Sequence, residues 1–210
     1  MGLASVLVVE DDSFSRSLIA RVLESANFEV ETADSANKAM GLLDTFNPRV
    51  CLVDLDLGPG PTGVDLAHAI RARIPAVGIV FLSSFKDHRL SRAADLPLPK
   101  GARYLTKGAL NQIERLTTEL LSASLKPLTI ERGLHPKVPL TSHQMEIMRL
   151  VAQGLTNQQI ALEQGTSEKA IEHVIARILQ RIGVDRNPRL NPRVQLVQAY
   201  AELSGRPVPR

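Results

Sequence analysis

The residues best suited to chemistry in this chain are carboxylates that directly follow short apolar runs. Glu10 and Asp11 follow the run 6–9, and Asp54 follows the run 50–53. Short runs rich in β-branched residues predict strands that are buried on both faces. In an open parallel sheet, ligands bind where the carboxyl ends of the strands meet. An aspartate at a strand end can also simply cap a loop, so the interpretation depends on the neighbouring strands.

Two further predicted strands also end on polar side chains. Ser83 follows the run 77–82, and Lys107 lies just beyond the run 102–105. Clustered carboxylates take up protons unless a cation is present, and oxygen ligands suit Mg²⁺. Mg²⁺ and Lys107 would offset the charge of a phosphoryl group, and the Ser83 hydroxyl would contact it. This arrangement predicts Asp54 as a nucleophile that forms an aspartyl phosphate.

The elements that must position these side chains alternate along residues 1–125. Strand patterns and helix patterns follow one another five times. This alternation predicts a doubly wound α/β fold, with a five-stranded parallel sheet of flavodoxin-like type and helices on both faces.

Three of the predicted helices have features that the structure can test. Asp12 or Ser13 caps the first helix, and its inward face includes Phe14 and Leu18. Residues 86–95 predict a short helix, because two prolines follow it closely. The last helix of this part is predicted over 110–125, with its inward face including Leu110 and Ile113.

Composition divides the chain into two parts. Residues 1–125 carry 13 basic and 15 acidic side chains, a net charge of −2, whereas residues 126–210 carry 12 and 7, a net charge of +5. The basic second part favours a polyanionic partner. The single cysteine, Cys51, lies in a predicted strand, so it is interpreted as a core residue of a protein in a reducing compartment. No apolar stretch approaches the ~18 residues of a membrane span, and no basic leader precedes the first strand, so we expect a cytoplasmic protein.

The pattern of the second part predicts a linker followed only by helices. Residues 126–139 contain three prolines and a glycine, which predicts the linker, and residues 140–210 form the second predicted domain. Four helices are predicted in it. The first begins after the cap Thr141 or Ser142, the second covers 157–163, the third begins after the cap Ser167, and the fourth covers 194–203. Two short helices joined by a tight turn and followed by a longer one predict a helix-turn-helix. A small all-α module that binds another protein would show the same pattern.

Four motifs of the first part resemble the receiver domain of bacterial two-component response regulators. They are Val8–Asp12, Leu52–Asp54, Leu82–Ser84 and Tyr104–Lys107. The resemblance implies that Asp54 accepts phosphate from a histidine kinase and that the chain is not an enzyme beyond slow self-phosphorylation and dephosphorylation. It implies an Mg²⁺ site made by Glu10, Asp11, Asp54 and the main-chain carbonyl of Asp56. Ser83 and Tyr104 would then be the switch pair, and Lys107 a phosphoryl contact.

Five short motifs of the second part resemble the LuxR/NarL-type output domain. They are Leu140–Thr141, Leu150–Asn157, Ile160–Ala161, Ser167–Lys169 and Arg177–Leu179. The resemblance implies that residues 168–181 enter the major groove of promoter DNA, and that the chain dimerises through the helix 194–203, the receiver, or both. The DNA-contact candidates are Thr156, Asn157, Ser167, Lys169, Glu172, His173, Arg177 and Arg181.

Glu172 departs from the family pattern, in which this position is usually basic. A carboxylate facing phosphates weakens DNA binding, whereas one facing a cytosine amino group specifies a base. The alternative left open is an atypical regulator whose helical domain binds a protein rather than specific DNA.

Overall fold

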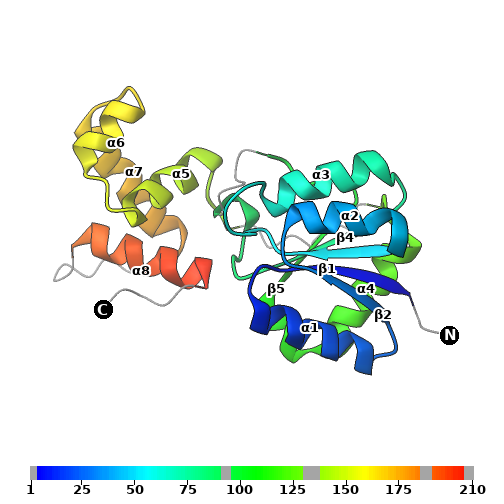
Figure 1. The fold of residues 1–210 in the computed structure, drawn as a ribbon. Coiled ribbons are helices and arrows are strands. Elements are labelled where there is room, and N and C mark those ends of the chain that lie inside the picture. Colours follow the sequence, from blue (N-terminus) through cyan, green and yellow to red (C-terminus); the bar gives the residue numbers. More distant parts are fainter. Residues whose placement is uncertain (1–3, 91–95, 130–137, 185–190, 206–210) are drawn as a thin grey trace. The chain divides into compact units, whose positions relative to one another are not determined.

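The computed structural model describes residues 4–90, 96–129, 138–184 and 191–205 (Figure 1). The chain forms two compact units. The first consists of residues 1–84 and 95–136, and the second consists of residues 85–94 and 137–210. The predicted boundaries of 1–125, 126–139 and 140–210 do not assign residues 85–94 to the second domain.

A five-stranded parallel sheet forms the centre of the first unit, as predicted. Its strands are β1 (Ser5–Val9), β2 (Glu29–Ala33), β3 (Val50–Val53), β4 (Gly78–Ser83) and β5 (Arg103–Thr106). Their order across the sheet is β2-β1-β3-β4-β5, which is the flavodoxin-like order of a doubly wound fold. Val9 is paired with Val53, and Ser83 with Thr106, so the carboxyl ends of these strands lie side by side.

Helices cover both faces of this sheet. They are α1 (Ser13–Ser25), α2 (Ala36–Phe46), α3 (Gly63–Arg73) and α4 (Ile113–Leu125). Figure 1 shows α1 and α4 on one face and α2 and α3 on the other. Alternate side chains of the central strands, such as Val6 and Val8, pack against Leu23 of α1 and Leu116 of α4. Burial on both faces explains why β3 and β4 are continuous apolar runs.

The predicted inward face of α1 is wrong at two positions. Phe14 is 76% exposed and Leu18 is 43% exposed, whereas Ile19 and Leu23 are fully buried. The buried stripe of the helix therefore runs through Ile19 and Leu23, and Phe14 and Leu18 lie one above the other on the neighbouring stripe. Asp12, rather than Ser13, caps the helix by accepting a hydrogen bond from the Ser15 N–H.

The predicted helix over 110–125 begins later than expected. Residues Lys107–Asn111 form a 3₁₀ helix, η2, and α4 begins at Ile113. Ile113 is 45% exposed rather than inward, because it occupies the first turn of α4. The predicted helix over 86–95 is limited, within the described residues, to the 3₁₀ turn η1 (His88–Leu90), and residues 91–95 lie outside them.

Cys51 is a core residue, as expected. Its side chain is fully buried in β3, and this burial raises the pKa of the thiol to about 12. A thiol with so high a pKa stays protonated at neutral pH and is a poor nucleophile.

The described part of the second unit contains four α-helices and η1. They are α5 (Ser142–Ala152), α6 (Asn157–Glu163), α7 (Glu168–Arg181) and α8 (Pro192–Ser204). Thr141 and Ser167 cap α5 and α7, and the last helix begins two residues earlier than predicted because Asn191 caps it ahead of Pro192. Ile171, Ile175 and Ile178 form the buried stripe of α7, so the opposite face of this helix is left exposed.

Candidate functional site

Carboxylates from β1 and β3 meet at one edge of the sheet. Glu10 and Asp54 each follow the last residue of their strand, and the Asp54 N–H donates to the Val9 carbonyl at 2.9 Å. Ligand oxygens of Glu10, Asp11 and Asp54 all lie within 4.8 Å of one another. Glu10 and Asp54 are buried, with Asp54 only 7% exposed, whereas Asp11 is exposed. The cluster is therefore open to solvent on the side of Asp11.

Lys107 completes this cluster from the start of η2. Its Nζ lies 2.8 Å from Glu10 Oε2 and 3.1 Å from Asp54 Oδ2. Burial alone would lower the pKa of the ammonium, but Asp54 and Glu10 outweigh burial and raise it. Lys107 is thus a cation that bridges the ends of three strands, as the sequence predicted.

The electrostatics of the cluster favour a further cation. Burial raises the pKa of Asp54 to about 6; Lys107 opposes this shift and Glu10 adds to it. Burial also raises the pKa of Glu10. Three carboxylates against one ammonium leave an excess of negative charge. Hard oxygen ligands with one exposed member are the donor set that Mg²⁺ prefers, since this ion keeps several of its waters.

An arginine that the sequence analysis did not single out holds the acidic loop in place. Arg16 Nη1, from α1, donates to the Glu10 carbonyl at 2.7 Å and to the Asp11 carbonyl at 3.1 Å. These bonds fix the main chain that carries the two carboxylates. The available signal was the spacing, because a basic residue in the first turns of a helix can reach back to the loop that precedes it.

This packing requires two glycines, one in the loop after β3 and one at the first position of α3. Gly58 has a φ of +69°, and a Cβ there would lie 3.1 Å from Asp11 Oδ2. A Cβ on Gly63 would lie 1.9 Å from the Asp54 carbonyl oxygen. The start of α3 thus approaches the main chain of Asp54 more closely than any side chain permits. Thr62 and Asp65 fix the same turn through a capping box.

We predict that Gly63→Ala destabilises the first unit by about 2 kcal/mol or more, because the added methyl group displaces the backbone at Asp54. The matched control is Gly41→Ala in α2, where a Cβ meets no atom within 4 Å. That change should stabilise the helix by roughly 0.5–1 kcal/mol. Urea denaturation followed by circular dichroism measures both, and equal midpoints would contradict the close approach.

The other predicted members of this site lie near the same edge. Ser83 is fully buried at the end of β4, and Tyr104 on β5 is buried as well. Asp56 is half-buried two residues beyond Asp54. Their roles as switch residues and as a main-chain ligand remain predictions.

The second unit presents charged side chains on one face of α7. Lys169, Glu172, His173 and Arg177 are exposed there, opposite the buried isoleucine stripe. Thr156 and Ser167 accept hydrogen bonds from the first turns of α6 and α7. These caps fix the residues at which both helices begin. In a helix-turn-helix, the second of the two helices is the one presented to DNA.

Two predicted DNA-contact side chains have partners inside the domain. Arg181 Nη1 donates to the buried Gln144 Oε1 at 3.0 Å. Asn157 Oδ1 accepts a hydrogen bond from Arg193, whose guanidinium also binds the Leu155 carbonyl. Arg193 thereby ties the start of α8 to the turn before α6.

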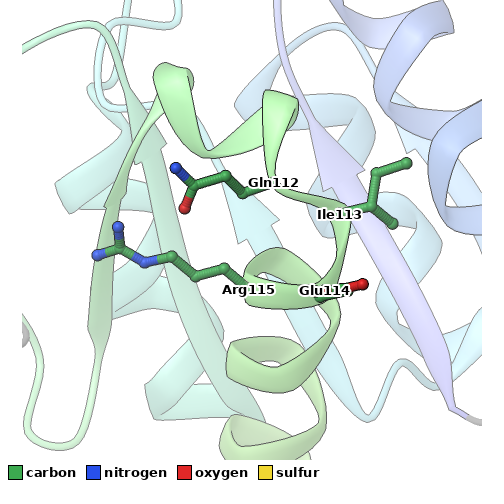
Figure 2. A pocket seen from close by; sticks show the side chains of 4 residues that line it. All are labelled: Gln112, Ile113, Glu114 and Arg115. Carbon is green, nitrogen blue, oxygen red and sulfur yellow. The ribbon is translucent and has the colours of Figure 1, made fainter.

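A separate hollow lies at the start of α4. Figure 2 shows Gln112 and Arg115 extending to one side of the chain there and Ile113 to the other. The hollow has a volume of about 520 Å³, and Glu114 completes its lining. All four side chains are exposed, and the hollow shares no residue with the acidic cluster.

Among the described residues, no helix is both long and apolar enough to cross a membrane.

Comparisons with known proteins identify two families along the chain. The family described as response regulator receiver domain matches residues 6–116, and the family described as bacterial regulatory proteins, luxR family, matches residues 138–191. The oxygen regulatory protein NreC of Staphylococcus aureus (strain JH9) is 25% identical over 203 residues, which cover 88% of this chain and 94% of the relative.

Solved structures support the fold of both units. Full-length FixJ from B. japonicum is 22% identical, with a TM-score of 0.51 over 98% of each chain. The response regulator RcsB in its complex with DNA is 20% identical, with a TM-score of 0.57 over 95% of this chain and 98% of that chain. At these identities the similarity establishes the fold alone.

Proposed function

Since the chain belongs to the response regulator receiver family, we propose that Asp54 accepts a phosphoryl group and that this modification controls DNA binding by the second unit. The protein is a response regulator of transcription, with a receiver domain followed by a luxR-family domain. The luxR-family match favours DNA over a protein as the partner of the helical domain. One observation carries the choice of Asp54. Asp54 and Glu10 both contact the Lys107 ammonium, and Asp54 is the more accessible of these two buried carboxylates, at 7% exposed against 1% for Glu10.

The chemistry is a transfer from a phosphohistidine of a histidine kinase. A carboxylate oxygen of Asp54 attacks the phosphorus atom, a P–O bond forms, and the P–N bond to the kinase histidine breaks with its electron pair on nitrogen. Glu10, Asp11, Asp54 and the Asp56 carbonyl would hold Mg²⁺, which would supply positive charge to offset that of the phosphoryl oxygens. Lys107 pairs with one of these oxygens, and its ammonium is already within reach of Asp54.

Two further side chains respond to the phosphoryl group. The Ser83 hydroxyl donates to a phosphoryl oxygen, and the Tyr104 ring, which is already buried, packs inward behind this hydroxyl. The reactions proposed for the chain itself are slow self-phosphorylation and self-hydrolysis. Because the kinase histidine and promoter DNA are both cytoplasmic, we place the protein in that compartment.

The exposed face of α7 enters the major groove, and the chain binds as a dimer through α8, the receiver, or both. Lys169 and Arg177 contact phosphates, His173 faces the groove, and Glu172 reads a base. Asn157 and Arg181 act indirectly, since their present partners fix α6 and α7. Thr156 and Ser167 sit at helix N-termini, where main-chain N–H groups meet phosphate.

The function is tested by incubating the chain with Mg²⁺ and acetyl phosphate and mapping promoter binding across a bacterial genome with and without this phosphodonor. We expect a hydroxylamine-sensitive acyl phosphate and an increased occupancy of a defined set of promoters. No binding at low salt in either state would reject the DNA-binding proposal, because the phosphate contribution to affinity is strongest there.

Mg²⁺ is expected to raise the melting temperature of the chain, because an ion that binds only the folded cluster stabilises it. At 100 times the dissociation constant the gain is about 2.7 kcal/mol. Asp11→Ala should abolish most of the shift, whereas Asp34→Ala, on an exposed loop, should retain it. Equal shifts in the two variants, measured by calorimetry, would exclude Asp11 as a ligand.

A further inference from the structure

The segment that directly follows β4 belongs to the helical unit. Residues 85–94 group with residues 137–210, whereas Ser83 and Ser84 belong to the first unit. The chain therefore passes from one unit to the other between Ser84 and Phe85. That crossing lies two residues after the side chain proposed to contact the phosphoryl group.

Phe85 is part of the core of the helical unit. It is 4% exposed and belongs to the same apolar cluster as Leu140, Met145 of α5 and Leu196 of α8. The next residue adds a main-chain bond, in which the Lys86 N–H donates to the Leu203 carbonyl of α8 at 2.8 Å. An aromatic side chain buried to this degree contributes on the order of 2–3 kcal/mol to stability.

A buried ion pair fixes the other end of the segment. Asp87, which is 2% exposed, pairs with Arg89 at 2.8 Å and accepts a hydrogen bond from the Val138 N–H at 3.1 Å. Arg89 donates in turn to the Leu140 carbonyl at 2.9 Å and the Val138 carbonyl at 3.1 Å. His88 Nδ1 lies 3.6 Å from Asp87 Oδ1. The pair thus binds the main chain that leads into α5.

The charge state of Asp87 agrees with this network. Burial acts to raise the pKa of its carboxyl, but hydrogen bonds from Arg89 and Val138 outweigh burial and hold the pKa below its ordinary value. The buried carboxylate is well satisfied by the Arg89 main-chain N–H, the Arg89 guanidinium and the Val138 N–H, and removal of its charge would weaken these bonds.

We propose that residues 85–89 dock into the helical unit as part of its fold and act as a lever that joins Ser83 to the DNA-binding domain. The docking uses Phe85 in the core, the Lys86 main chain on α8, and the Asp87–Arg89 pair at the entrance to α5. The lever rests on the proposed function, because it transmits the phosphorylation of Asp54.

Only one residue, Ser84, separates Ser83 from Phe85. Two residues span at most about 7 Å when fully extended, so a shift of Ser83 toward the phosphoryl group is passed to Phe85. Phosphorylation of Asp54 then displaces Phe85, which is part of the apolar core of the helical unit.

Two kinds of variant separate docking from the lever. Asp87→Asn weakens docking, and Lys86→Ala is its control, because the exposed Lys86 side chain is not used. Insertion of two glycines between Ser84 and Phe85 slackens the tether while leaving the docked residues intact. The same insertion between Gly133 and Leu134, in the predicted linker, is its control.

The full-length chain is measured by hydrogen exchange and by DNA affinity with and without acetyl phosphate. We expect Asp87→Asn to speed exchange in α5 and α8 at least 10-fold while exchange in β1 and β3 stays unchanged. We expect the insertion at Ser84 to leave hydrogen exchange and the labelling of Asp54 unchanged. The ratio of the DNA affinity with acetyl phosphate to that without it should fall to near one.

Each outcome bears on a separate statement. Unchanged hydrogen exchange in Asp87→Asn would overturn docking. If DNA affinity responded fully to acetyl phosphate after the insertion at Ser84, the lever would be overturned. If Asp87→Asn fails to fold, the insertion still tests the lever and Phe85→Leu still tests docking by a smaller rise in exchange. If the wild-type chain itself is not labelled, or its DNA affinity does not respond, the proposed function fails instead.

Discussion

Asp54→Asn is expected to abolish phosphorylation by acetyl phosphate or a histidine kinase, with a loss of label on the order of 10³-fold or more. The amide keeps the shape of the side chain but is not a nucleophile. Glu10 is less accessible than Asp54, at 1% exposed, and is paired with Lys107. Transfer of radiolabelled phosphate to purified chain measures the effect.

The same change should not unfold the protein. The pKa of Asp54 is raised to about 6 by burial, so the folded chain binds more protons than the unfolded chain, and the wild type loses stability as pH rises from about 4 to 6. At pH 7 without Mg²⁺, the neutral asparagine should therefore be more stable by roughly 1–3 kcal/mol. Asp44→Asn, which alters a surface pair with Arg73, is the control and should be labelled normally. Label retained in Asp54→Asn would reject this residue as the acceptor.

Replacing both Lys169 and Arg177 with alanine is expected to weaken promoter binding by about 10- to 100-fold and to reduce the salt slope by about two. Both side chains are exposed on α7 and carry the positive charge of its outer face. Loss of two phosphate contacts lowers affinity for all sequences to a similar extent. Mobility shifts over a range of salt concentrations provide the measurement.

The control for this pair must change the net charge equally. Lys38→Ala with Arg73→Ala removes two positive charges from the first unit, where both residues pair with surface aspartates. This control should leave affinity nearly unchanged. A similar loss in the two double variants would mean that net charge, and not the α7 face, drives binding.

Glu172 provides a sharper readout on the same face. If it accepts from a cytosine amino group, Glu172→Gln should relax the preference at one base position, by about 1–3 kcal/mol of discrimination. If it only repels phosphate, the variant should bind all sequences more tightly. Selection from random DNA distinguishes the two results.

The sequence by itself determined the fold class and the central cluster. Strand period and helix period are local properties, and a parallel sheet necessarily brings the carboxyl ends of neighbouring strands to one edge. Glu10, Asp54 and Lys107 therefore had to meet once their runs were recognised as strands. The cap at Ser167 was also predictable, because a cap depends on residues three positions apart.

Tertiary structure alone decided which partners the remaining side chains find. The orientation of α1, which exposes Phe14, depends on how the helix rotates against the sheet, and the need for Gly63 depends on how closely α3 approaches Asp54. Phe85 looks like any apolar residue after a strand, yet it belongs to the core of the second unit. Such contacts join residues far apart in the chain, and they form only where the packing of whole elements brings complementary groups together, which no local pattern encodes.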